Sequence, residues 1–120
     1  MMSKYDQAEA YYKNALDIAL IINDQASIAL QYRNIAILYK LQNEIMKSIA
    51  LFEKSMEIEV KINNQFNISK LKLEYGHALC LNNNTIKGLE LLHSAKLFFV
   101  SQRLENELST ANQYIKQFEE

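Results

Sequence analysis

The fold is decided by residues 32–55, which read YRNIAILYKLQNEIMKSIALFEKS. Bulky apolar and small side chains recur in this stretch at steps of three and four residues, which is typical of helices that bury one face. The steps are interrupted at Gln42 and Asn43, and asparagine tolerates the left-handed conformation that ends many helices. The stretch therefore predicts two helices joined by a short loop, which forces them to run antiparallel.

The pattern returns 40 residues later, in residues 72–95, which read KLEYGHALCLNNNTIKGLELLHSA. Bulky positions coincide with bulky ones and small with small, as in the pairs Tyr39 and Leu79, Phe52 and Leu92, Ala36 and Gly76, and Ser48 and Gly88. Self-similarity at a fixed period indicates stacked repeats of one supersecondary unit. We expect the small positions to mark where the two helices of a hairpin cross. Close contact there would explain two helical glycines, each of which destabilises its helix by about 1 kcal/mol relative to alanine.

Apolar spacing along the whole chain predicts six helices, at residues 4–22, 26–41, 45–62, 68–81, 86–102 and 106–118. Four of the five breaks between them contain asparagine, which we expect to end one helix and to cap the next. Ser3 and Thr85 are further expected caps, because a hydroxyl oxygen accepts bonds from the first amides of a helix. Proline is absent and glycine occurs twice, which argues against a turn-rich β sandwich or barrel. The predicted fold class is therefore all-α.

Composition restricts the class of protein further. The chain has 120 residues, 49% of them hydrophobic, and a formal net charge of -1, so it gives no reason to expect nucleic acid or an anionic membrane as a partner. No apolar run approaches the roughly 18 residues that span a bilayer, and residues 1–7 lack the apolar core of a signal peptide. Cys80 is the single cysteine, so no internal disulfide forms. We expect a cytoplasmic protein.

On these residues the chain resembles the tetratricopeptide repeat family, whose motif places large, small and aromatic residues at set positions of a helix pair. The middle repeat matches through Tyr32, Ile35, Ala36, Tyr39, Ser48, Phe52 and Ser55, and the next repeat through Tyr75, Gly76, Leu79, Gly88, Leu92 and Ala95. The chain departs from the family in its period of 40 residues, where about 34 is common. It also lacks the proline that follows the second helix of a repeat, where Val60 and Val100 stand.

The resemblance implies a right-handed superhelical solenoid of antiparallel helix hairpins, with about six helices in a single domain over residues 1–120. Its expected parts are a half repeat at 3–22, repeats at 26–62 and 67–102, and a terminal helix at 105–119. A solenoid of this kind exposes an extended concave face. The resemblance therefore implies a scaffold or adaptor module that binds a protein or a peptide, either by itself or as the sensor of a larger regulator.

The resemblance also implies that the first helix of each repeat lines the concave face. The expected peptide-binding residues are Arg33, Asn34, Ile37, Lys40, Lys70, Leu73, Glu74 and His77, with Gln113 and Gln117 added by the last helix. Arginine and lysine would hold carboxylates there, and asparagine would bond the backbone of an extended peptide. The alternative for each of these residues is an ordinary solvated helix face.

Self-association is a second hypothesis for the function. The opening helix matches only the second half of a repeat and the closing helix only the first half, so apolar surface around Tyr5, Tyr12 and Leu16 would be uncovered. Copies of the chain could cover this surface by stacking end to end or by swapping a helix, which would give a homo-oligomer. The same ends are also expected of a piece of a larger protein.

Catalysis is the remaining hypothesis. Glu74, His77 and Cys80 share one face of a helix, where a cysteine and a histidine can form a nucleophile and all three can bind a metal. A fourth zinc ligand is not evident, His93 lies on another predicted helix, and the sequence has no glycine-rich phosphate loop. We therefore expect a structural role for these residues, no enzyme activity, no metal and no cofactor.

Overall fold

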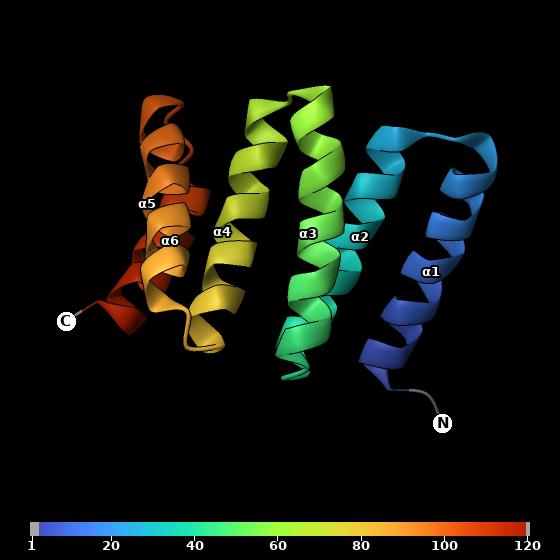
Figure 1. Ribbon diagram of the computed structural model, residues 1–120, viewed down its shortest axis with the longest axis horizontal. Coiled ribbons are helices and arrows are strands. Elements are labelled where there is room, and N and C mark those ends of the chain that lie inside the picture. The colour runs from blue at the N-terminus through green and yellow to red at the C-terminus, as the bar shows by residue number, and fades with distance from the viewer. Residues whose placement is uncertain (1–2, 120) are drawn as a thin grey trace. The chain divides into compact units, whose positions relative to one another are not determined.

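The computed structural model describes residues 3–119, in which every regular element is an α-helix (Figure 1). The helices are α1 (Lys4–Ile22), α2 (Gln25–Leu41), α3 (Ile45–Ile62), α4 (Gln65–Leu81), α5 (Thr85–Ser101) and α6 (Glu105–Phe118). All six predicted helices are confirmed, although α2, α4, α5 and α6 begin one to three residues earlier than predicted. These first turns escape prediction because residues such as Gln25 and Gln65 are polar and add nothing to the apolar period.

The helices form two compact units, one of α1 to α3 and one of α4 to α6, with the boundary between Asn63 and Asn64. Within each unit, consecutive helices pack against each other as antiparallel hairpins, which can be followed along the colours of Figure 1. In the first unit α2 contacts both of its neighbours, and in the second unit α5 does so. The predicted all-α chain of sequential helix hairpins is therefore confirmed. The assignment of residues 1–120 to one domain stays a prediction.

Residues in the left-handed conformation separate the helices at a regular interval. Within residues 3–119, positive φ angles outside glycine occur every 20 residues, at Asn23, Asn43, Asn63, Asn83 and Arg103. After α1, the amide of Asp24 donates to the carbonyl of Ala19, and together with a second bond from Asn23 this forms a Schellman motif. The same bond pair follows α2, α4 and α5. The predicted role of asparagine in ending helices is confirmed, and Arg103 takes that role without being an expected residue for it.

Side-chain caps begin α1, α2 and α4. Ser3 caps α1 as predicted, because its Oγ accepts from the amide of Asp6 at 3.1 Å and the Asp6 carboxylate accepts from the Ser3 amide at 3.3 Å. Asp24 caps α2 by accepting from the hydroxyl and the amide of Ser27 at 2.8 and 3.2 Å. These bonds from Ser27 lower the pKa of Asp24, because they favour its charged form. Asn64 caps α4 in the equivalent position.

The predicted cap at Thr85 is wrong. Thr85 is the first residue of α5, and Asn84 occupies the cap position with no side-chain cap bond in the described structure. The preceding turn causes this shift, because the amide of Asn84 donates to the carbonyl of Leu79 at 2.8 Å. The Schellman motif around Asn83 thereby fixes which residue begins the next helix.

Helices α4 and α5 cross at the two glycines of the chain. A Cβ atom on Gly76 would lie 2.8 Å from the carbonyl oxygen of Gly88. A Cβ atom on Gly88 would lie 2.5 Å from the Sγ of Cys80 and 2.7 Å from the oxygen of Gly76. All three distances are shorter than van der Waals contact, so this crossing admits only glycine without a shift of the helices. The prediction that small residues mark the crossing is confirmed.

Helices α2 and α3 cross in the same register, with Ala36 and Ser48 at the equivalent positions, and both residues are fully buried. The Oγ of Ser48 donates to the carbonyl of Ala36 at 2.6 Å. Two turns further along α3, the Oγ of Ser55 donates to the carbonyl of Ala29 at 2.7 Å. The buried hydroxyls are thus satisfied by main-chain oxygens, as burial of a polar group requires. Small residues therefore allow close packing in both hairpins. The hairpin of α2 and α3 uses serines that bond main-chain oxygens, and the hairpin of α4 and α5 uses glycines.

Candidate functional site

The second unit joins its outer helices, α4 and α6, through an aromatic contact. The rings of His77 and Tyr114 are parallel to within 3° with centroids 3.7 Å apart, and Phe118 meets His77 edge-on at 5.9 Å. The Nε2 of His77 donates to the Oε1 of Gln117 at 2.9 Å, since an amide oxygen only accepts. His77 therefore lies against α6 and is nearly buried, with 9% of its surface exposed.

Glu74 takes part in the same contact. The hydroxyl of Tyr114 donates to its two carboxylate oxygens at 3.3 and 3.5 Å. Burial and the nearby charge of Glu74 raise the pKa of Tyr114 above its usual range, because both disfavour a phenolate. Glu74 and Tyr114 are 40 residues apart, and so are His77 and Gln117. The 40-residue period is the sequence signal that could have found these pairs.

The other expected binding residues lie on two separate helices. In the first unit, Arg33, Asn34 and Ile37 of α2 are partly buried, and Lys40 is only 7% exposed. The Nδ2 of Asn34 donates to Gln31 on the same helix at 3.4 Å. In this unit the expected residues therefore share α2, and their role in binding stays a prediction.

In the second unit, the expected residues Lys70 and Leu73 lie on α4 with Glu74 and His77. The ammonium of Lys70 lies 5.3 Å above the ring of Phe66, and Leu73 belongs to the hydrophobic core. Of the two glutamines expected from α6, Gln117 meets His77, and Gln113 lines an open hollow of about 400 Å³. All described residues lining that hollow come from α6. The structure thus brings Glu74 and His77 together through α6, and uses Leu73 in packing.

A groove of about 340 Å³ opens in the first unit, lined by Lys13 and Leu16 of α1, Ile35 and Tyr39 of α2, and Lys47, Ala50 and Leu51 of α3. Helices α1 and α3 both pack on α2 but bring no described pair of Cα atoms within 8 Å of each other. The residues of α2 therefore form the floor of the groove, and α1 and α3 form its walls. Five of the seven described lining residues are apolar. The volume is at the small end of the range for ligand sites, roughly 300–1,000 Å³.

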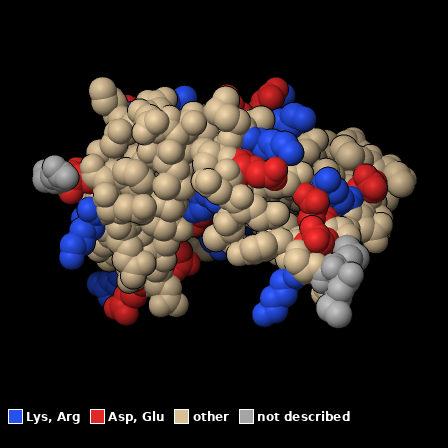
Figure 2. Space-filling view, turned by 90° about the horizontal axis from the view of Figure 1, so that it is seen from below, with Lys and Arg blue, Asp and Glu red and all other residues tan. Residues whose placement is uncertain are grey.

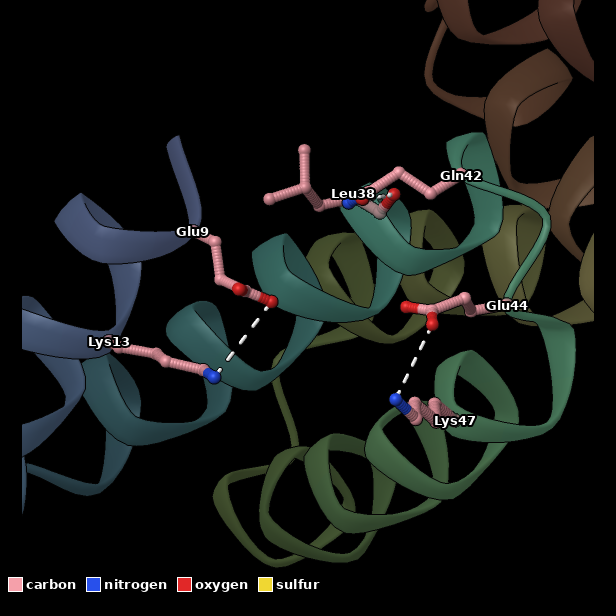
Figure 3. Close-up of polar contacts among 6 residues, drawn as sticks. All are labelled: Glu9, Lys13, Leu38, Gln42, Glu44 and Lys47. Atoms are coloured by element: carbon pink, nitrogen blue, oxygen red, sulfur yellow. Dashed lines mark hydrogen bonds and ion pairs between the residues drawn. The ribbon is translucent and has the colours of Figure 1, made fainter. Parts of the chain in front are cut away.

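One lysine stands on each wall of this groove. Lys13 forms an ion pair with Glu9 of the same helix at 3.8 Å, and Lys47 forms one at 3.4 Å with Glu44, the residue just before α3 (Figure 3). The side chains of Lys13 and Lys47 are 55% and 66% exposed. The ammonium of Lys47 also lies 5.7 Å from the ring centroid of Tyr39, so it is positioned above the floor of the groove. The groove is thus an apolar surface between two accessible cations.

The groove and the expected binding residues of α2 occupy different faces of that helix. Ile37 is two residues from both Ile35 and Tyr39, so at about 100° per residue it projects from nearly the opposite side. Sequence reasoning missed the groove because Ile35 and Tyr39 fit the buried seam of a repeat. Leu16 belongs to the apolar surface that the sequence predicts to be uncovered, and this is the one sequence signal that indicates the groove.

Exposed apolar side chains form a second feature of the first unit. On α1, the side chains of Tyr11, Ile18, Ile21 and Ile22 are exposed by 72%, 54%, 83% and 65%. Tyr11, Ile18 and Ile22 lie seven and four residues apart, which places them on one stripe of the helix. On the face of the molecule in Figure 2, cationic and anionic side chains are interspersed among larger uncharged areas.

The three residues considered for catalysis do not converge. Cys80 is 2% exposed and lies beside Gly88 of α5, whereas His77 faces α6. Burial raises the pKa of the Cys80 thiol, which opposes formation of a nucleophilic thiolate. Within residues 3–119, no group of three or more His, Cys, Asp or Glu side chains is placed to hold a metal ion. In the same part of the chain, no helix has the length and apolar character needed to cross a bilayer.

Comparison with known proteins identifies no relative of this chain. No protein-family model matches the sequence, and neither the curated proteins nor the solved structures give a significant match. The class of protein is therefore defined by the fold, which over residues 3–119 is all-α, with two units of three helices in which consecutive helices pack as antiparallel hairpins.

Proposed function

We propose that the chain is a protein- or peptide-binding module of the tetratricopeptide-repeat kind, and that the groove between α1 and α3 is a binding site. Repeating large and small positions and sequential helix hairpins support the repeat assignment. Modules of stacked hairpins present extended surfaces rather than enclosed active sites. The expected residues of α2 and α4, among them Arg33, Asn34 and Lys70, are the competing location for the same function.

The groove carries the proposal because it combines access with an apolar floor. Ile35 and Tyr39 lie at its base, between helices that hold their walls apart. Covering apolar surface is favourable by roughly 25 cal/mol for each Å² removed from water. Concave apolar sites with a few polar groups at their edges are the usual form of a binding site. Lys13 and Lys47 supply such polar groups at the two edges of the groove.

The test is to fill the groove without disturbing the fold. Ala50 is exposed on α3 and lines the groove, so Ala50→Tyr places a ring in the groove and removes no packing. Ala10 is exposed on α1 outside the groove, and Ala10→Tyr is the matched control. Peptides selected from a random displayed library should bind the unaltered chain and Ala10→Tyr alike. We expect Ala50→Tyr to weaken them by roughly tenfold or more, because a central contact surface is lost.

The same peptides separate the two locations. Loss of binding in Arg33→Ala and Asn34→Ala, with full binding in Ala50→Tyr, would move the site to the face expected from the resemblance. A library that yields no peptide selective for this chain over an unrelated helical protein would contradict the binding function itself.

Self-association is a second candidate, and the exposed stripe on α1 favours it. Tyr11, Ile18 and Ile22 expose large apolar surface on one helix face, which is more than scattered single residues usually do. A second copy of the chain would cover the stripe by pairing along α1. Light scattering over a concentration series should then show a dimer that Ile18→Lys converts to monomer. A monomer at every concentration would remove this candidate.

A further inference from the structure

We infer that the occupant of the groove is an amphipathic helix whose apolar stripe is bordered by acidic residues on both sides. The inference rests on the proposed function, because it names the partner of the same groove. It depends on three observations of the first unit, namely the spacing of the lining residues, their apolar character and the position of the two lysines.

The spacing of the lining residues fits a helix. The groove is lined at helical steps along every element, by Lys13 and Leu16 on α1, Ile35 and Tyr39 on α2, and Lys47 and Leu51 on α3. Steps of three and four residues form ridges with grooves between them, into which the ridges of another helix fit. Residues at i, i+3, i+4 and i+7 of a partner helix would therefore interdigitate with those of the walls.

The apolar character of the groove disfavours an extended occupant relative to a helical one. An extended peptide directs unpaired amide and carbonyl groups toward the surface that it covers, and burial of each without a partner is unfavourable. Of the floor residues, Tyr39 offers partly exposed aromatic surface and Ile35 is only 2% exposed beneath it, and both lie on a continuous helix whose backbone bonds are internal. A helix satisfies its own backbone and presents only side chains, so it is the secondary structure that such a groove accepts.

The rim lysines determine the charge of the occupant. Lys13 and Lys47 stand on opposite walls, whereas their partners Glu9 and Glu44 are not among the described lining residues. Ion pairs between solvent-accessible side chains contribute little, so each lysine can turn to a carboxylate of the partner. A helix with lysines beside its apolar stripe would instead bring like charges together at both walls. The complementary pattern is an acidic residue on each side of the stripe.

The inference is tested with stapled helical peptides that share one leucine stripe and differ only in the flanking residues, which are Glu, Gln or Lys. Fluorescence anisotropy should give the tightest binding for the Glu peptide, about three- to tenfold tighter than for the Lys peptide. The double variant Lys13→Glu with Lys47→Glu should reverse that order. The double variant Lys4→Glu with Lys61→Glu, on exposed parts of α1 and α3 outside the groove, is the control matched in charge and should leave the order unchanged. The difference between peptides should shrink as salt is added.

The outcomes distinguish this inference from the proposed function. Equal binding of the three peptides, lost in Ala50→Tyr, would leave the groove as the site and overturn the acidic partner. Equal or tighter binding of a proline-containing extended version of the Glu peptide would overturn the helix. Binding that Ala50→Tyr does not weaken would remove the groove and with it both proposals.

Discussion

The hairpin of α2 and α3 and the hairpin of α4 and α5 share a 40-residue register and differ in the chemistry of their crossing points. In the first, Ser48 has a Cβ atom and bridges to the carbonyl of Ala36 at 2.6 Å. In the second, a Cβ atom on Gly88 would meet Gly76 and Cys80 within 2.9 Å. The shared register therefore requires a small residue at both crossings, but the space between the two helices at that point differs from one hairpin to the other. The crossing of α2 and α3 has room for the Ser48 side chain and its hydrogen bond. The crossing of α4 and α5 has no room for a Cβ atom and is occupied by glycine.

The outer helices of the two units differ as well. Helices α1 and α3 leave the groove over Ile35 and Tyr39 between them. Helices α4 and α6 instead meet through the stacked rings of His77 and Tyr114. Aromatic and polar side chains that would be available to a partner are thus used within the second unit. The comparison supports the first unit as the location of the proposed binding site.

Gly88→Ala should have the largest effect, because it tests directly whether the crossing of α4 and α5 lacks room for a Cβ atom. The added methyl group would lie 2.7 Å from the oxygen of Gly76 and 2.9 Å from the amide nitrogen of Cys80, and backbone atoms cannot rotate away. We expect a loss of about 2–3 kcal/mol in the free energy of unfolding, because overpacking outweighs the roughly 1 kcal/mol that alanine adds to helix propensity. Urea unfolding followed by circular dichroism measures it. A variant about 1 kcal/mol more stable than the parent would mean that helix propensity alone governs this position.

Ser48→Ala tests the other crossing without adding or removing a Cβ atom. The variant loses the hydroxyl that donates to Ala36, and we expect the free energy of unfolding to fall by about 1 kcal/mol. The matched control is Ser101→Ala, whose hydroxyl bonds the carbonyl of Phe98 on an exposed part of α5. The control should unfold like the parent in the same urea titration. Equal stability of both variants would show that the bridge in the first hairpin adds nothing.

Much of this comparison could be predicted from the sequence, because the features involved are periodic. The seam of Phe52 and Leu92 specifies two equivalent helices, and the small residues in register with Gly88 specify their crossing. The asparagines between helices reveal where they end, since left-handed backbone suits few other residues. The helices and hairpins therefore follow from the sequence, apart from the polar first turns and the cap at Thr85.

The groove could not be predicted in this way. It exists because α1 and α3 stay apart while both pack on α2, and that distance depends on three helices at once. Ile35 and Tyr39 look like core residues in any window of the sequence. The contact of His77 with Tyr114 is different, since its neighbouring pairs obey the 40-residue period and could have been found. Roles for Arg33 and Asn34 depend on a ligand and stay predictions.

Arg103→Asn would make the second unit more like the first. Position 103 follows Asn23 and Asn63 by the 40-residue period, yet it holds arginine at a φ of 56°. Left-handed backbone is unfavourable by about 1–2 kcal/mol for most residues and less for asparagine, so we expect the variant to gain about 0.5–1 kcal/mol in unfolding free energy. Urea unfolding measures the gain. The neighbouring Gln102→Asn, at a φ of -98°, is the control and should gain nothing.

The smallest expected effect is a difference in pH dependence between the caps of α2 and α4. Asp24 and Asn64 provide these caps and are 40 residues apart. Hydrogen bonds from Ser27 lower the pKa of Asp24 in the folded chain, so its contribution is fully present above the unfolded pKa of about 3.9 and is lost as pH falls through the lower folded value. The neutral amide of Asn64 does not titrate there. NMR in acid should therefore show the amide of Ser27 shifting with the Asp24 titration while the amide of Asn67 stays constant. Asp24→Asn should abolish the shift at Ser27, and a shift that persists in this variant would assign it to another group.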